Sequence, residues 1–162
     1  MNILDIYRRR SITERILFLL LFFFLFGYLI VRAVMVPMLG DETLTFYNYI
    51  QSENFIPYFA IWDANNHILN SFLSFLSFKL FGNNPLSLRL PNVLSFIVFA
   101  YYVVLISENF KSNLVRITFV LTLLLTHNLI EFFNLSRGYG MSMALMSGSI
   151  YYALRFSQTK KV

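Results

Sequence analysis

The sequence contains no cysteine, and this absence removes several kinds of chemistry at once. Disulfide frameworks, thiolate metal sites and cysteine nucleophiles are all excluded. The motifs of soluble enzymes are missing as well: the chain has no G-x-S-x-G sequence, no glycine-rich phosphate loop, and no pair of metal ligands four residues apart with a third ligand to complete it. Any activity must therefore depend on the few charged and polar side chains that the chain does have.

Charged residues are scarce too, at 13% of the 162 residues, whereas 57% are hydrophobic and the mean hydropathy is +0.62. Such a composition does not fit an ordinary soluble domain. It predicts an all-α polytopic membrane protein, a bundle of transmembrane helices. The 13 basic residues outnumber the 8 acidic ones, but they lie in clusters beside apolar runs, which is typical of juxtamembrane anchors. We therefore expect membrane lipids among the partners, and no nucleic acid.

Apolar runs long enough to cross a ~30 Å hydrocarbon layer as helices predict four spans, at about 16–36, 90–106, 117–134 and 139–155. The first span follows a cluster of four arginines, Arg8, Arg9, Arg10 and Arg15. A basic flank of this kind places the N-terminus in the cytoplasm, although a secretory signal peptide ending near residue 33 is the alternative interpretation. Pro37 and Gly40 end the first helix, so the loop 37–66 begins on the outer face.

This outer loop, residues 37–66, holds four of the eight acidic residues. Residues 41–53 within it predict a short amphipathic juxtamembrane helix. Its polar side would carry Asp41, Thr45, Asn48 and Ser52, and its apolar side Leu44, Tyr47 and Ile50. We expect the apolar side of this helix to lie among the lipid headgroups.

Residues 67–81 are apolar but few, and Asn70, Ser74 and Ser77 share one helical stripe. The stripe predicts a helix whose polar side faces protein while its Phe and Leu side chains face lipid. If the segment crossed the membrane, the later basic clusters would lie outside, against the usual charge bias. We therefore favour a partial or interfacial helix over a full crossing.

With this topology, five ionisable residues converge on one outer-facing surface: Asp41, Asp63, His67, Arg89 and Arg137. Each also has a structural interpretation, because acidic residues at helix starts and in turns cap backbone groups, and arginines beside spans reach for headgroups. A second polar pair, His127 and Glu131, lies within an apolar block. An intramembrane carboxylate needs a partner. We expect His127 or Arg137 to supply it, and a proton or ion path is the alternative.

Several motifs occur in an order that resembles a known family. Gly-Asp-Glu begins at residue 40, Trp-Asp-x-x-Asn-His at 62, Phe-Gly-Asn-Asn-Pro-Leu-Ser-Leu-Arg-Leu-Pro-Asn at 81, and Ser-Arg-Gly-Tyr-Gly at 136. This order resembles the N-terminal portion of the polytopic glycosyltransferases of the C-type fold. That group includes protein O-mannosyltransferases and the aminoarabinose transferases that modify lipid A. The resemblance covers about residues 10–155.

The resemblance implies transfer of a sugar from a polyprenyl-phosphate carrier to an acceptor on the extracytoplasmic face, and it favours the bacterial plasma membrane over the endoplasmic reticulum. Asp41 matches the acidic loop residue that acts on the acceptor as a catalytic base, with Glu42 beside it. The substrate-binding matches are Asp63, His67, Arg89 and Arg137. A divalent metal held by Asp63 and His67 is left open, because Asn65-Asn66-His67 stands where lipid A transferases have Glu-Lys-Pro.

Enzymes of this family are much longer, so the chain resembles the front part of one. We expect it to be inactive without a missing C-terminal half or a partner membrane subunit. The residue types suit the chemistry, since a carboxylate can take the proton of a hydroxyl acceptor and arginine can stabilise a departing phosphate. The alternative function is a non-enzymatic membrane scaffold. It would bind its partner through the polar stripe of 67–81 and through Ser147, Gly148 and Ser149.

Overall fold

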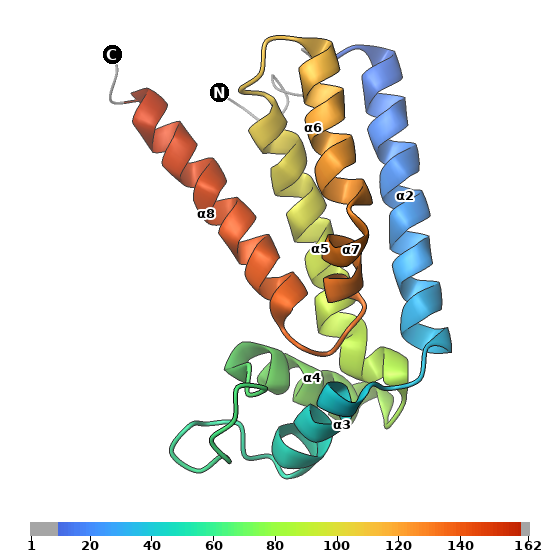
Figure 1. The fold of residues 1–162 in the computed structure, drawn as a ribbon, viewed down its shortest axis with the longest axis vertical. Coiled ribbons are helices and arrows are strands. Elements are labelled where there is room, and N and C mark those ends of the chain that lie inside the picture. Colours follow the sequence, from blue (N-terminus) through green and yellow to red (C-terminus); the bar gives the residue numbers. More distant parts are fainter. Residues whose placement is uncertain (1–9, 160–162) are drawn as a thin grey trace.

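The computed structural model describes residues 10–159, and every regular element in that range is a helix (Figure 1). The prediction of an all-α fold is thereby confirmed. The arginines Arg8 and Arg9 of the basic flank lie outside the described residues. The elements are α2 (Ile12–Met35), α3 (Gly40–Thr45), the π-helix η1 (Phe46–Gln51), α4 (Ile68–Phe81), α5 (Pro85–Ser107), α6 (Asn113–Leu125), α7 (His127–Phe133) and α8 (Tyr139–Thr159).

Two of these helices, α2 with 24 residues and α5 with 23, are long and apolar enough to cross a membrane. Helix α2 covers the predicted span 16–36 except its last residue, α5 contains the predicted span 90–106, and each helix begins with a capped turn. Ser11 accepts a hydrogen bond of 3.1 Å from the backbone N–H of Glu14, and Asn84 accepts one of 2.8 Å from that of Ser87. The chain therefore has the helices of an integral membrane protein.

The predicted span 117–134 is a bent pair of helices, and the last predicted span is less apolar than the first two. Helices α6 and α7 meet at an angle of 56° and qualify together as one broken span. Thr126 forms the break, because its ψ of 111° leaves the helical region. Helix α8 has 21 residues and includes 139–155. By length and composition, the described residues contain two spans, or three if the bent pair counts as one.

Helix α5 is the centre of the bundle and contacts α2, α4, α6, α7 and α8. In Figure 1, α2, α5 and α6 run side by side, while α8 diverges from α5 toward its C-terminus. Gly148 permits the contact between α8 and α5, because a Cβ there would lie 3.0 Å from the ring of Tyr102. Lipid is as apolar as these side chains, so close packing, rather than removal from water, holds the helices together. The centre of this core is formed by Leu29, Val93, Phe96, Val103 and Phe133.

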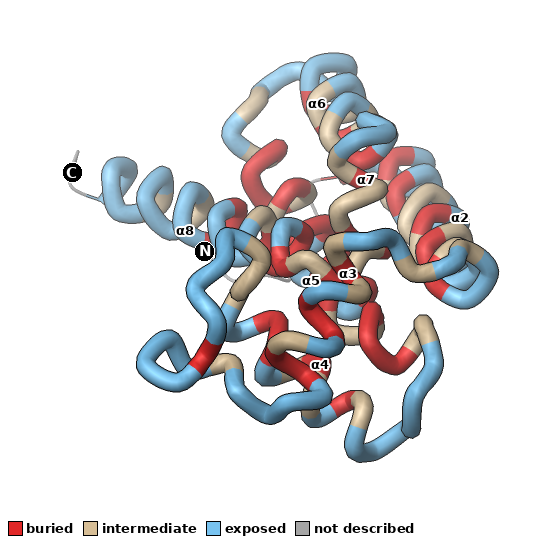
Figure 2. The backbone as a smooth tube through the Cα atoms, turned by 60° about the horizontal axis from the view of Figure 1, so that its bottom comes forward, coloured by how far each residue is buried: buried red, intermediate tan, exposed pale blue. Residues whose placement is uncertain are grey.

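Helices α3 and α4 and the π-helix η1 lie across the end of the bundle where α2 ends and α5 begins (Figure 1). With 14 residues, α4 is about 21 Å long and too short for a full crossing of ~30 Å. Its buried residues are Asn70, Ser71, Ser74 and Ser77, so the predicted polar stripe does face protein (Figure 2). Leu80 is 76% exposed and Phe81 61%. This helix is polar inside and apolar outside.

The predicted juxtamembrane helix consists of α3 and η1, and it packs with a different side than the sequence predicts. Phe46 and Ile50 are buried with Leu88 of α5, and Thr45 is buried as well. The placement of Ile50 among lipid headgroups and of Thr45 on the solvated side was therefore wrong. The reason is that the end of the bundle offers partners to this side, whereas Leu44 remains 47% exposed.

Candidate functional site

The buried centre of this end of the bundle is an ion pair between Glu42 of α3 and Arg89 of α5. Neither side chain is exposed to solvent. The guanidinium donates two parallel hydrogen bonds to the carboxylate: Nε donates to Oε1 at 2.8 Å, and Nη2 donates to Oε2 at 2.6 Å. This bidentate geometry is the strongest form of an arginine–carboxylate contact. It fixes α3 against α5.

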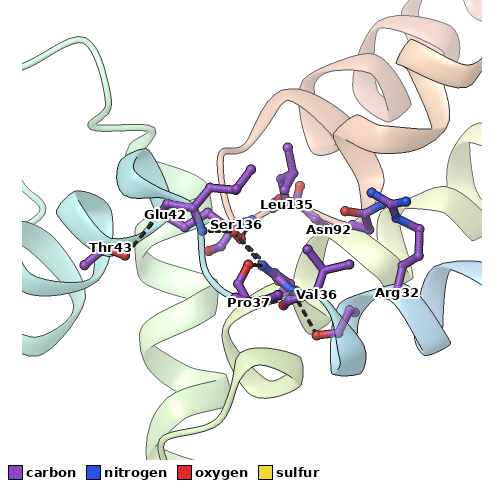
Figure 3. A network of polar contacts seen from close by, with 12 residues as sticks. Arg32, Val36, Pro37, Glu42, Thr43, Asn92, Leu135 and Ser136 are labelled. Carbon is purple, nitrogen blue, oxygen red and sulfur yellow. Dashed lines mark hydrogen bonds and ion pairs between the residues drawn. The ribbon is translucent and has the colours of Figure 1, made fainter.

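Arg89 also satisfies the end of α2, whose last carbonyl groups have no partner within the helix. Nη1 donates to the backbone oxygens of Ala33 at 3.1 Å and Val36 at 2.7 Å, and Nη2 donates to that of Pro37 at 3.1 Å. The five N–H groups of the guanidinium thus have five acceptors. One side chain of α5 holds the turn that joins α2 to α3 (Figure 3).

Glu42 is equally saturated. Its carboxylate accepts from the backbone N–H of Leu39 at 3.1 Å, and from that of Ser136 at 2.7 Å, in addition to its two bonds from Arg89 (Figure 3). A carboxylate with four donors and no exposure has no position left for a substrate. The structure therefore places Glu42, expected to be catalytic, and Arg89, expected to bind substrate, in a buried platform under the accessible residues.

The buried side-chain amide of Asn92 extends this platform to α4 and α8. Asn92 of α5 donates from Nδ2 to Oδ1 of Asn70 at 2.8 Å and to the backbone oxygen of Leu135 at 2.7 Å. Its own Oδ1 accepts from the backbone N–H of Met141 at 3.2 Å. Asn92 lies inside a predicted span, and a buried polar residue there is the signal that should have marked it. The sequence interpretation missed it.

Above the platform lies an accessible group, formed by Asp41 and Arg137. Nη2 of Arg137 is 2.8 Å from Oδ2 of Asp41, and the two side chains are 27% and 45% exposed, respectively. The guanidinium carbon of Arg137 lies 5.2 Å from the centre of the Tyr139 ring, as in a cation–π contact. Since Glu42 and Asp41 are neighbours in the first turn of α3, the burial of Glu42 leaves Asp41 facing outward. A ligand can reach both of these residues of the predicted site.

His67 belongs to the same accessible group. Its ring lies 4.9 Å from that of Tyr139 in an edge-on contact, and its Nε2 atom is buried without a hydrogen-bond partner. Burial lowers the pKa of His67, and the positive charge of Arg137 lowers it further. The imidazole is therefore neutral at pH 7. Gly138 permits this approach, because at its φ of +72° a Cβ would lie 2.7 Å from the Cβ of His67.

Asp63 lies apart from this group. Its Oδ1 accepts from the backbone N–H of Asn65 at 2.8 Å, as in an ordinary Asx turn. Its negative charge, together with burial as the larger cause, raises the pKa of Tyr49. Among the described residues, no three His, Asp or Glu side chains lie close enough to hold a metal ion. The residues present thus do not fit the metal that the resemblance left open at Asp63 and His67.

Glu131 of α7 has a partner that the sequence did not suggest. Nη2 of Arg32, in the last turn of α2, donates to Oε2 of Glu131 at 2.6 Å, and Asn134 donates to the same oxygen at 3.3 Å. His127 is more distant, with its Nδ1 atom 3.9 Å from Oε1. Arg137, the other expected partner, pairs with Asp41 instead. Glu131 therefore ties α7 to α2, which favours structural pairing over an ion path.

Comparison of the chain with protein-family models, curated proteins and solved structures finds no match. The arrangement of side chains at this end of the bundle is therefore the basis for assigning a function. It consists of a buried platform of Glu42, Arg89 and Asn92, and of an accessible group above it, formed by Asp41, His67, Arg137 and Tyr139.

Proposed function

We propose that this chain forms the catalytic end of a membrane glycosyltransferase, which transfers a sugar from a polyprenyl-phosphate carrier to an acceptor on the extracytoplasmic face. The observation that carries the proposal is the accessible pair of Asp41 and Arg137 beside a neutral His67. Such a transfer needs a base for the proton of the acceptor hydroxyl and a positive group beside the departing phosphate. A carboxylate and a guanidinium in contact at the end of an apolar bundle can supply both. The order of motifs in the sequence supports the same assignment.

In this mechanism Asp41 accepts the proton of the acceptor hydroxyl as it attacks the sugar. Arg137 stabilises the negative charge that develops on the carrier phosphate as the bond to the sugar breaks. His67 lies within the same group and, being neutral, offers a hydrogen bond rather than a charge. The platform keeps the three groups in position, because it fixes α3, α4 and the segment before α8 to α5.

The distribution of charge supports placing this site outside the cell. At the end of the bundle where α2 begins, the described residues include five basic side chains, Arg10, Arg15, Lys111, Arg116 and Arg155, against the two acidic ones Glu14 and Glu108. At the other end, acidic residues equal or outnumber basic ones. Cytoplasmic segments carry the excess of Lys and Arg. This bias supports the proposal that the end with Asp41 faces away from the cytoplasm.

The scaffold alternative loses most of the surfaces assigned to it, although Ser149 remains exposed. The polar stripe of α4 packs inside this chain, and so do Ser147 and Gly148, which are buried against α5. A stripe already satisfied by the chain itself is not available to a separate partner. We therefore prefer the enzyme proposal, because Asp41 and Arg137 remain partly exposed.

The test is transfer of a labelled sugar from a synthetic polyprenyl-phosphate donor, measured in membranes that contain the protein at a known level. Asp41→Asn is expected to lower the rate at least about a hundredfold, the scale of general-base catalysis. Glu53→Gln is the matched control, since it removes an acidic residue from the same loop that pairs only with exposed Lys79. Because the chain is expected to need a C-terminal half or a partner subunit, the assay uses its native membranes, and full activity in the Asp41→Asn protein would overturn the proposal.

A further inference from the structure

A groove lies along α2 at the end of the bundle opposite Asp41, between three helices, α2, α5 and α6. Figure 1 shows these helices side by side. Its walls come from α2, α5 and α6 and are almost entirely apolar, with Phe18, Leu19 and Phe22 on one side and Ile97 and Ala100 on the other. Leu19 and Ile97 are 48% and 42% exposed. In a membrane these side chains meet lipid, so the groove is a place where an acyl chain can lie.

The length of the groove is close to that of one leaflet. Its lining residues on α5, from Ile97 to Leu105, span about 12 Å, and half of a ~30 Å hydrocarbon layer is about 15 Å. The apolar walls thus extend from the level of the headgroups to the middle of the bilayer. A lipid tail that entered from the headgroup end would be covered along its length.

Two arginines, Arg10 and Arg15, close the headgroup end of this groove. Arg10 is fixed there by an ion pair with Glu108 and by bonds from Nη2 to the backbone oxygen of Val104 at 2.7 Å and to Oγ of Ser107 at 3.2 Å. Two arginines against one glutamate leave this end of the groove with a net positive charge. Its guanidinium also lies 5.1 Å over the ring of Phe18, which lines the groove. Basic residues at this depth attract the phosphate of an anionic headgroup. The groove therefore presents an apolar channel with a positive rim.

We propose that this groove is a binding site for an anionic phospholipid of the cytoplasmic leaflet. One acyl chain lies between α2 and α5, and the headgroup phosphate lies at the rim formed by Arg15 and Arg10. The net positive charge of this end of the bundle complements such a lipid and gives no preference for a zwitterionic one. The site is separate from the group around Asp41, and the proposal does not depend on sugar transfer.

The test compares phosphatidylglycerol with phosphatidylcholine, using the purified full chain in detergent and counting retained lipid by native mass spectrometry. We expect preferential retention of phosphatidylglycerol by the wild-type protein. Arg15→Gln is expected to lower the affinity for it about fivefold, the equivalent of about 1 kcal/mol for one basic residue. Leu19→Trp, which places a larger side chain in the groove, should reduce the retention of this lipid as well.

The matched control is Arg155→Gln, which removes a positive charge from the same end of the molecule but from α8, outside the groove. Retention that falls equally in Arg155→Gln would mean that the overall charge is responsible and would overturn the site. Equal retention of the two lipids by the wild-type protein, or unchanged retention in the Leu19→Trp protein, would overturn it too. In the unmodified protein, a photoactivatable phosphatidylglycerol should label residues 15–22 and 97–105, and labelling elsewhere contradicts the proposal.

Discussion

Glu42 and Arg89 lie 47 residues apart in the chain, have no solvent exposure, and are joined by hydrogen bonds of 2.8 and 2.6 Å. Removing water from two charges is costly, and only complete pairing offsets the cost. The neighbours of this pair complete it, since three carbonyl oxygens accept from Arg89 and two backbone N–H groups donate to Glu42. Its role is to hold the functional end of the bundle together.

Replacing either member of the pair is expected to destabilise the fold strongly. Glu42→Gln or Arg89→Gln leaves an uncompensated buried charge, which costs about 3–5 kcal/mol. Arg89→Lys should also fail, because an ammonium has three donors and lacks the planar fork. The measurement is the midpoint of unfolding in detergent. Glu53→Gln is the comparison, since its exposed pair with Lys79 contributes about 0–1 kcal/mol; equal effects at both pairs would contradict this role.

Asn92 is expected to matter for stability in spite of its position in a membrane span. Asn92→Ala removes two donated bonds and one accepted bond, and leaves Oδ1 of Asn70, the oxygen of Leu135 and the N–H of Met141 unsatisfied. An unsatisfied buried polar group costs about 1–3 kcal/mol. Thermal unfolding in detergent measures the loss. A more stable Asn92→Ala protein would show that the amide does not serve as a junction.

Gly138 and Gly27 provide a matched pair of glycine substitutions. Gly138→Ala is expected to destabilise, because an alanine at positive φ costs roughly 1–2 kcal/mol and its Cβ would lie 2.7 Å from His67. Gly27→Ala lies in the middle of α2 with nothing within 4 Å, and should stabilise by up to about 1 kcal/mol. Unfolding midpoints compare the two. We expect the midpoint to fall in Gly138→Ala and to rise in Gly27→Ala, and equal midpoints in the two variants would contradict the described turn at Gly138.

The stability of the protein should include a dependence on the protonation of His67. Its pKa in the folded protein lies below the ordinary value of 6.5, so the unfolded chain binds the proton first as the pH falls. The stabilising contribution is complete above pH 6.5 and is lost as the pH falls below it. Unfolding midpoints measured from pH 8 to pH 5 should therefore fall less in His67→Gln than in the wild type. Parallel curves for the two proteins would contradict the burial of the imidazole.

The absence of cysteine makes the proposed topology directly measurable. Lys79→Cys, on the exposed face of α4, is expected to react with a membrane-impermeant thiol reagent added outside cells. Lys111→Cys, which is exposed between α5 and α6 at the opposite end, should react only after the membrane is opened. The excess of basic residues at the Lys111 end is the reason for this order. Labelling of both residues from outside would contradict it.

Residue patterns predicted those parts of the fold that depend on local chemistry. The apolar runs of α2 and α5 define helices by composition alone, and the spacing of Asn70, Ser74 and Ser77 predicts the polar side of α4. The break at Thr126 was missed, because it follows a continuous apolar run that contains neither glycine nor proline. Local patterns carry no information about a bend that neighbouring helices impose.

The site was predicted in part, for a related reason. The sequence places Asp41 and Glu42 side by side but does not say which of them faces α5, and the answer depends on Arg89, 47 residues away. The partner of Glu131 is likewise Arg32, 99 residues away. The group of Asp41, His67 and Arg137 was expected, whereas Asp63 lies apart. Long-range pairing decided which carboxylate remains exposed.

The five contacts of Arg89 have a consequence for the biosynthesis of the protein. The carbonyl of Pro37 receives its hydrogen bond from a side chain that the ribosome adds 52 residues later. Until Arg89 has been synthesised, the carbonyl groups in the turn after α2 lack their hydrogen-bond donor. This end of the bundle therefore cannot be completed before α5 lies beside α2, and the contacts of Glu42 with Ser136 and of Asp41 with Arg137 form later still.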